Sequence, residues 1–185
     1  GASVFYVDHH FSGDIPEHEN LTAIINEAPD VCTAALVNGY LNGRHLDWAV
    51  TGAFGDNLKD TARTLASSLD ISEQDLVSLD ALGTYINYNG YGPAIADLHF
   101  DPKDLYLRLY AADGPLDFVH NSADFEKLST GYGEDMAKAE ALQPLNSNAT
   151  SAVFLLPDET WARRVSGVYS NDLATENPER AHAVL

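Results

Sequence analysis

The sequence has little cysteine and few basic residues. Its single cysteine, Cys32, excludes a disulfide within the chain, which fits a reducing compartment. Because Cys32 stands in an apolar run, we expect it to be a small core residue. Ten Lys and Arg stand against 28 Asp and Glu, which gives a formal charge of −18. An acidic surface repels a phosphate backbone, so long nucleic acid is not an expected partner, and solubility in a salty habitat is the simplest reason for the charge.

Long hydrophobic runs are missing as well. No stretch reaches the ~18 apolar residues that a membrane-spanning helix needs, and no charged-then-apolar leader opens the sequence. We therefore expect a cytoplasmic protein with no membrane contact. What the chain does have is 45% apolar residues, enough for the core of one mid-sized domain or of one domain and part of a second.

The pattern of apolar residues predicts an α/β fold. Residues 3–7 (SVFYV) are typical of a buried strand, and helical spacing dominates from about residue 31 to residue 142. Ser72, followed three residues later by Asp75, resembles a capping signal for one of these helices. The helices are expected at 31–41, 46–54, 58–69, from 72 onward, at 102–111 and at 134–142.

The chain changes character after residue 143. Residues 144–148 (PLNSN) are polar and rich in turn formers, which indicates a linker. Beyond it the β–α–β order predicts a second domain with parallel strands, expected as a strand at 152–156, a helix at 161–173 and a strand at 182–185. We therefore divide the chain into a first portion (1–143), a linker (144–150) and the beginning of a second domain (151–185).

Asp8-His9-His10, directly after the first strand, is the strongest local signal of a site. In open α/β sheets, ligands bind outside the carboxyl ends of the strands. A carboxylate and two imidazoles there suit a divalent metal and a phosphate, because Mn²⁺ and Zn²⁺ accept mixed nitrogen and oxygen ligands. Neighbouring strand residues point to opposite faces, so one imidazole is expected to bind metal and the other to contact substrate. The alternative is three polar residues in a surface loop.

A second signal is the segment 52–57 (GAFGDN), where an apolar helix ends in glycines and a carboxylate follows. Glycine lets another backbone or a ligand approach closely, so Asp56 could face a ligand. Asp56 also precedes the next predicted helix, and on its own it is better interpreted as the N-cap of that helix.

Together the two signals resemble the DHH phosphoesterase superfamily, which includes exopolyphosphatases, manganese-dependent inorganic pyrophosphatases and short-oligonucleotide phosphodiesterases. The resemblance rests on Asp8-His9-His10 after a strand and on the segment 48–57 (WAVTGAFGDN) at this distance from it. It implies the helix-rich second half of a parallel-sheet DHH catalytic domain, followed by the start of a smaller α/β DHH-associated domain. It also implies a hydrolase with a small phosphorylated substrate: polyphosphate, pyrophosphate, a nucleotide or a short oligonucleotide.

The resemblance assigns roles to four residues. His9 and Asp56 bind one Mn²⁺ (or Mg²⁺) ion of a two-metal site. Asp8 orients this pair, and His10 contacts the phosphate of the substrate, so that Asp8 and His10 take the catalytic roles. Thr33, at the start of the helix at 31–41, would line the same pocket.

The resemblance assigns no definite role to three further residues. Asn57 stands where the family often has Thr or Ser. Arg44 and Lys59 are candidates for phosphate contacts because cations are scarce here, although each is more simply a solvated surface charge.

The resemblance is also incomplete. The family's first two aspartate-bearing motifs lie before Asp-His-His, whereas only seven residues without an Asp precede it here. The glycine-rich segment with a histidine, typical of the family's C-terminal domain, is absent. The strand-like ends indicate an interior fragment, whose incomplete two-metal site would not turn over substrate by itself. The alternatives are a non-catalytic nucleotide-sensing or scaffolding domain that keeps the fold, and a coincidental match; open strand edges would also allow a homodimer.

Overall fold

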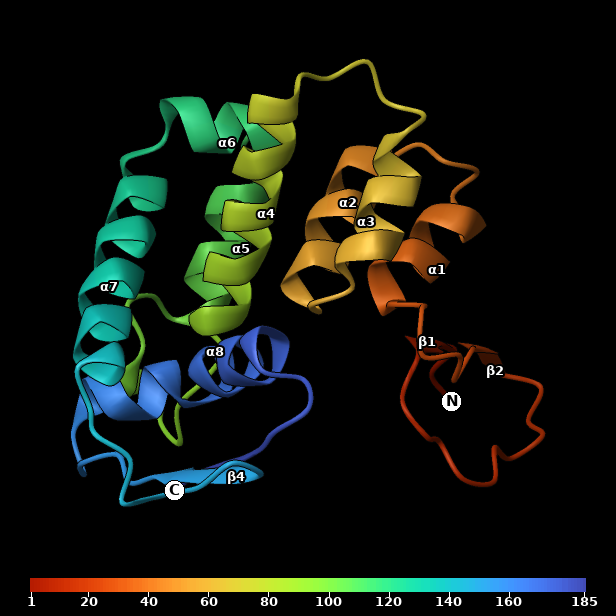
Figure 1. Cartoon of the computed structure of the whole chain (residues 1–185). Coiled ribbons are helices and arrows are strands. Elements are labelled where there is room, and N and C mark those ends of the chain that lie inside the picture. Colours follow the sequence, from red (N-terminus) through yellow and green to blue (C-terminus); the bar gives the residue numbers. More distant parts are fainter. The chain divides into compact units, whose positions relative to one another are not determined.

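The computed structural model describes residues 1–185, which form two compact units. The first unit contains Gly1–Gly83 with Gly114–Leu116, and the second contains Thr84–Asp113 with Asp117–Leu185 (Figure 1). The chain is mixed α/β and about 52% helical, with small parallel and mixed sheets, as the apolar pattern predicts. The expected linker at 144–150 lies inside the second unit, and the division into family domains stays a prediction. No helix combines the length and the apolar character that crossing a membrane requires.

The first unit combines two parallel strands with a group of short helices (Figure 1). Strand β1 (Val4–Asp8) pairs with β2 (Leu21–Ile25), so that Val4 lies opposite Leu21 and Asp8 opposite Ile25. The helices are α1 (Thr33–Tyr40), α2 (Leu46–Gly55), α3 (Lys59–Ala66) and the first part of α4 (Glu73–Tyr88). They enclose one core, formed by Cys32, Val50, Ala53, Phe54, Ala62, Ala66, Leu76 and Leu79. Cys32 is thus the core residue that the sequence predicts.

Strand β1 exists where it is expected, but it is not buried. Val4, Phe5 and Tyr6 are 50%, 49% and 45% exposed. Two strands leave one edge of β1 unpaired, and consecutive residues on both of its faces reach solvent. The prediction of a buried strand was wrong because the apolar run identifies the strand, whereas burial depends on what covers it.

Helix α4 begins with the capping signal that the sequence predicts. The backbone N–H of Asp75 donates to Ser72 Oγ at 3.1 Å. In return, the Ser72 hydroxyl and backbone N–H donate to the Asp75 carboxylate at 2.7 and 3.3 Å. This reciprocal pair satisfies two N–H groups that the first turn of a helix would otherwise leave unpaired.

Glycine permits a close approach of α4 to α2. A Cβ atom on Gly83 would stand 2.7 Å from the backbone nitrogen of Gly55 and in collision with the carbonyl oxygen of Thr51. Gly55 is the last residue of α2 and directly precedes Asp56. The position of Asp56 therefore depends on a helix contact that only glycine fits.

The second unit places α8 over a three-stranded sheet (Figure 1). Strand β4 (Ser151–Phe154) pairs antiparallel with β3 (Asn146–Ser147) and parallel with β5 (Ala181–Val184), and α8 (Thr160–Glu176) connects β4 to β5. The predicted β–α–β unit is therefore confirmed. The other elements of this part of the chain are the rest of α4, a 3-10 turn at Ile95–Asp97, α5 (Pro102–Tyr110), α6 (Pro115–Asn121), whose first two residues belong to the first unit, and α7 (Ala123–Glu140).

A buried polar cluster joins α4, α7 and α8 within this unit. The Tyr88 hydroxyl donates to the Asp135 carboxylate, and Arg164 Nε donates to the same carboxylate at 2.8 Å. His99 Nε2 lies 2.8 Å from the Tyr88 oxygen and donates its hydrogen to it, because Tyr88 gives its own hydrogen to Asp135. Burial raises the pKa of Tyr88 and lowers the pKa of His99. All four groups find partners, so the cluster holds three helices together.

Candidate functional site

Asp8 ends strand β1 by turning its carboxylate back onto its own backbone. Asp8 Oδ1 accepts the backbone N–H of His9 at 2.8 Å and that of His10 at 3.3 Å. Such a turn is typical of Asp and stops the strand, because these N–H groups no longer point along the sheet. The rings of the two histidines that follow lie side by side, with centroids 4.2 Å apart, but their nitrogens contact different partners.

The same carboxylate accepts two side-chain donors. Tyr6 donates its hydroxyl hydrogen to Oδ2 at 2.8 Å, and His10 Nδ1 lies 2.8 Å from Oδ1. The His10 side chain, followed by the Tyr6 hydroxyl, holds the pKa of Asp8 well below its usual range. The hydrogen bond to Asp8, followed by the charge of Asp8, correspondingly raises the pKa of Tyr6. Asp8 is therefore ionised, and it fixes the ring of His10, which is 75% exposed.

His9 points toward the helices instead. Its Nδ1 lies 2.8 Å from the carbonyl oxygen of Val31, just before α1. A carbonyl oxygen can only accept, so Nδ1 carries a hydrogen, and in the neutral ring Nε2 carries the lone pair. Nε2 lies 3.2 Å from Asp56 Oδ2, with the two side chains 18% and 39% exposed. The structure thus brings together two residues that are 47 positions apart.

Asp56 is the C-cap of α2, not the N-cap of α3. Its backbone N–H donates to the Gly52 carbonyl at 3.0 Å, and the N-cap of α3 is Leu58. Asn57 then adopts a left-handed conformation with φ of 59°, which ends α2. The interpretation of Asp56 as an N-cap was therefore wrong, because two residues lie between it and the first turn of α3. Its carboxylate is directed to His9.

The pair of His9 and Asp56 fits a divalent ion. Two ligand atoms at right angles on an ion, with bonds of about 2.1 Å, lie about 3.0 Å apart, close to the 3.2 Å between Nε2 and Oδ2. The hydrogen bond from Nδ1 to Val31 supplies the outer contact that metal-binding histidines usually have. Ligand atoms of Asp8, His9 and His10 also lie within 4.8 Å of one another. In that group, however, Asp8 already has hydrogen-bond donors on both oxygens.

The structure also shows the burial of the other residues predicted for the site. Thr33 is half-buried and is the first residue of α1. Arg44 and Lys59 are exposed, as expected for solvated surface charges, and Asn57 is exposed as well. Sequence reasoning missed Tyr6, although its position two residues before Asp8 in a strand puts both side chains on one face.

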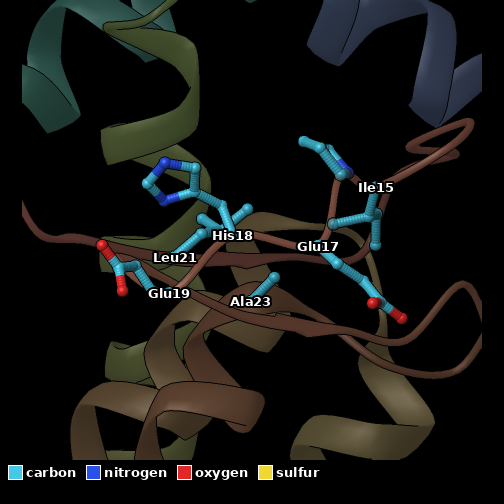
Figure 2. Close-up of a pocket in the computed structure, with 7 residues that line it drawn as sticks. Ile15, Glu17, His18, Glu19, Leu21 and Ala23 are labelled. Atoms are coloured by element: carbon cyan, nitrogen blue, oxygen red, sulfur yellow. The ribbon is translucent and has the colours of Figure 1, made fainter.

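A hollow lies beside β2, where the chain returns from residues 15–19 (Figure 2). It contains Glu17, His18 and Glu19, which could together suggest a metal site. The side chains of Glu17 and Glu19 point to opposite sides of the hollow in Figure 2. His18 Nδ1 accepts the backbone N–H of Asn20 at 3.0 Å. This hollow therefore does not gather its polar groups around one point.

Comparison with protein-family models, curated proteins and solved structures finds no match to this chain. The resemblance to DHH phosphoesterases therefore rests on the chain's own sequence motifs alone.

Proposed function

We propose that this chain carries part of the active site of a metal-dependent phosphoesterase of the DHH type. His9 and Asp56 hold one Mn²⁺ or Mg²⁺ ion, and His10 contacts the phosphate. The substrate is small and phosphorylated: polyphosphate, pyrophosphate, a nucleotide or a short oligonucleotide. In the finer fold assignment, the first 143 residues are the helix-rich second half of a DHH catalytic domain, and residues 151–185 begin its companion domain.

The observation that carries this proposal is the contact of His9 with Asp56. Because Val31 accepts the hydrogen on Nδ1, a neutral His9 directs a lone pair at a carboxylate oxygen 3.2 Å away. Two electron-rich atoms at that distance repel each other unless a cation lies between them. A proton is one such cation, and a divalent metal ion is the other.

The chain's own residues divide the work. His9 and Asp56 bind the ion, while Asp8 orients His10 through a 2.8 Å contact with its Nδ1. His10 Nε2 is then available to the phosphate, since the His10 side chain is 75% exposed. A bound ion would supply Lewis acidity and a coordinated water of lowered pKa.

Calorimetric titration with Mn²⁺ tests the proposal. We expect His9→Gln and Asp56→Asn each to weaken Mn²⁺ binding by about tenfold or more, because each removes a ligand. The matched control is Asp70→Asn, which removes an exposed carboxylate of the same unit and should leave the affinity unchanged. Equal affinity in all four proteins would refute the metal site.

Hydrolysis assays separate an enzyme from a sensing or scaffolding domain. In a longer chain that also contains the family's first two aspartate-bearing motifs, release of phosphate from pyrophosphate or polyphosphate, or of mononucleotides from a dinucleotide, should require Mn²⁺ and should be lost in Asp56→Asn. Binding of Mn²⁺ and a nucleotide without any hydrolysis would favour the non-catalytic alternative.

A further inference from the structure

Tyr6 has no role in the proposed chemistry, yet its hydroxyl reaches the centre of the site. Residues 6 and 8 of β1 lie on the same face of the strand, because side chains alternate. The Tyr6 hydroxyl donates to Asp8 Oδ2 at 2.8 Å. This contact is made on the side of the carboxylate away from His10, whose Nδ1 lies beside Oδ1.

Tyr6 completes the set of donors around Asp8. A carboxylate offers about four acceptor positions. Oδ1 accepts the backbone N–H groups of His9 and His10 and the His10 Nδ1 hydrogen, and Oδ2 accepts the Tyr6 hydroxyl. Three donors therefore contact Oδ1, and Tyr6 is the only one of the four on Oδ2.

We propose that Tyr6 is a positioning residue that holds the Asp8 carboxylate against His10. With the hydroxyl in place, the carboxylate cannot rotate toward water or an ion without losing the hydrogen bond on Oδ2. Oδ1 then stays beside His10, which keeps its hydrogen on Nδ1 and its lone pair on Nε2. His10 thus presents Nε2 to the site, as an acceptor in the neutral ring and as an N–H donor in the protonated ring. Only the donation of this N–H to a phosphate oxygen rests on the proposed function.

The same arrangement decides between two possible uses of Asp8. A metal ion bound by Asp8, His9 and His10 together would compete with the four hydrogen bonds that the Asp8 carboxylate already accepts. The His9–Asp56 pair meets no such competition. With Tyr6 in place, His9 is directed to the ion and His10 to the substrate.

The test is the tautomer of His10, measured by nitrogen-15 NMR on the metal-free chain at about pH 8.5, a pH about two units above the ordinary pKa of histidine. We expect the wild type to favour the form with hydrogen on Nδ1. Tyr6→Phe should lower the ratio of this form to the other by about three- to tenfold, the range that corresponds to one net hydrogen bond. The matched control, Tyr40→Phe, removes a hydroxyl from another exposed tyrosine of the same unit and should leave the ratio unchanged.

Two results would overturn the proposal: a wild type that carries the His10 hydrogen on Nε2, or an unchanged ratio in Tyr6→Phe. The phenylalanine variant keeps the ring and the β-propensity of the strand, so it is expected to fold. The measurement needs no metal ion. A chain that fails to bind Mn²⁺ would refute the proposed function, and the tautomer ratio would still decide on Tyr6.

Discussion

Replacing Gly83 with alanine should disturb the proposed metal pair from a distance. The new Cβ would stand 2.7 Å from the Gly55 backbone nitrogen, where carbon and nitrogen normally keep about 3.3 Å, and it would also collide with the Thr51 carbonyl. Both neighbours are helix backbone, so α4 must move away from α2. Because Asp56 follows Gly55 directly, the movement should shift its carboxylate relative to His9.

The size of the effect follows from this overlap. Overpacking of this kind costs about 1–3 kcal/mol, or roughly 3–10 °C in Tm for a chain of this length. Thermal unfolding followed by circular dichroism measures the loss. Titration with Mn²⁺ below the transition should also show weaker binding, although residue 83 contacts neither proposed ligand.

Gly39→Ala is the matched control. Gly39 lies in α1 of the same unit, and a Cβ there would meet nothing within 4 Å. Alanine should therefore raise stability by about 0.5–1 kcal/mol, because it reduces the backbone freedom of the unfolded chain. If both variants changed Tm in the same direction, the close approach of α2 and α4 would not be the cause, and the reasoning would fail.

Two predictions concern solution conditions. Burial, followed by the charge of Arg164, lowers the pKa of His99 in the folded chain. Below about pH 6.5, the ordinary pKa of histidine, unfolding therefore takes up a proton. The free energy of unfolding should be constant above that pH and should decrease as the pH falls through the lower pKa of folded His99. Urea unfolding between about pH 8 and 5 should show this loss, and His99→Gln should flatten it; an equal slope in both proteins would argue against His99. The formal charge of −18 should make the midpoint of urea unfolding rise when KCl is increased from about 0.1 to about 1 M, because salt screens the repulsion between carboxylates. A falling midpoint would mean that the loss of attractive ion pairs is the larger effect.

Local patterns predicted most of the helices. The start of α4 could be predicted from Ser72 and Asp75, because a cap is a contact within one turn. Helix α7 was expected only from residue 134, whereas it begins at Ala123. Gly131 interrupts its helical pattern, and the reason for that glycine lies elsewhere in the chain: a Cβ there would collide with the ring of His99. Sequence reasoning has no access to such a contact.

Strand β2 and the site show the same limit. The five residues Leu21–Ile25 were not predicted as a strand, because the pattern of a short apolar run does not reveal its partner. The contact of His9 with Asp56 was predicted only through the family resemblance, because the two residues are 47 positions apart in the sequence. Tyr6 was missed although its spacing from Asp8 puts both side chains on one face of the strand, whereas the Val31 carbonyl is a backbone oxygen and carries no sequence signal of its own.

The parallel pairing of β4 with β5 also has a consequence for the order of folding. Strand β3 and β4 form a hairpin across a short turn, so they can pair as soon as both are synthesised. The second edge of β4 stays unpaired until α8 and β5 have been synthesised, because a parallel strand can pair only after a crossover connection. During that interval β4 exposes Ala152 and Phe154, which are later buried against α8. The last residues of the chain are thus needed to close a sheet that begins about 40 residues earlier, and the interval before they arrive is when this unit is most open to aggregation.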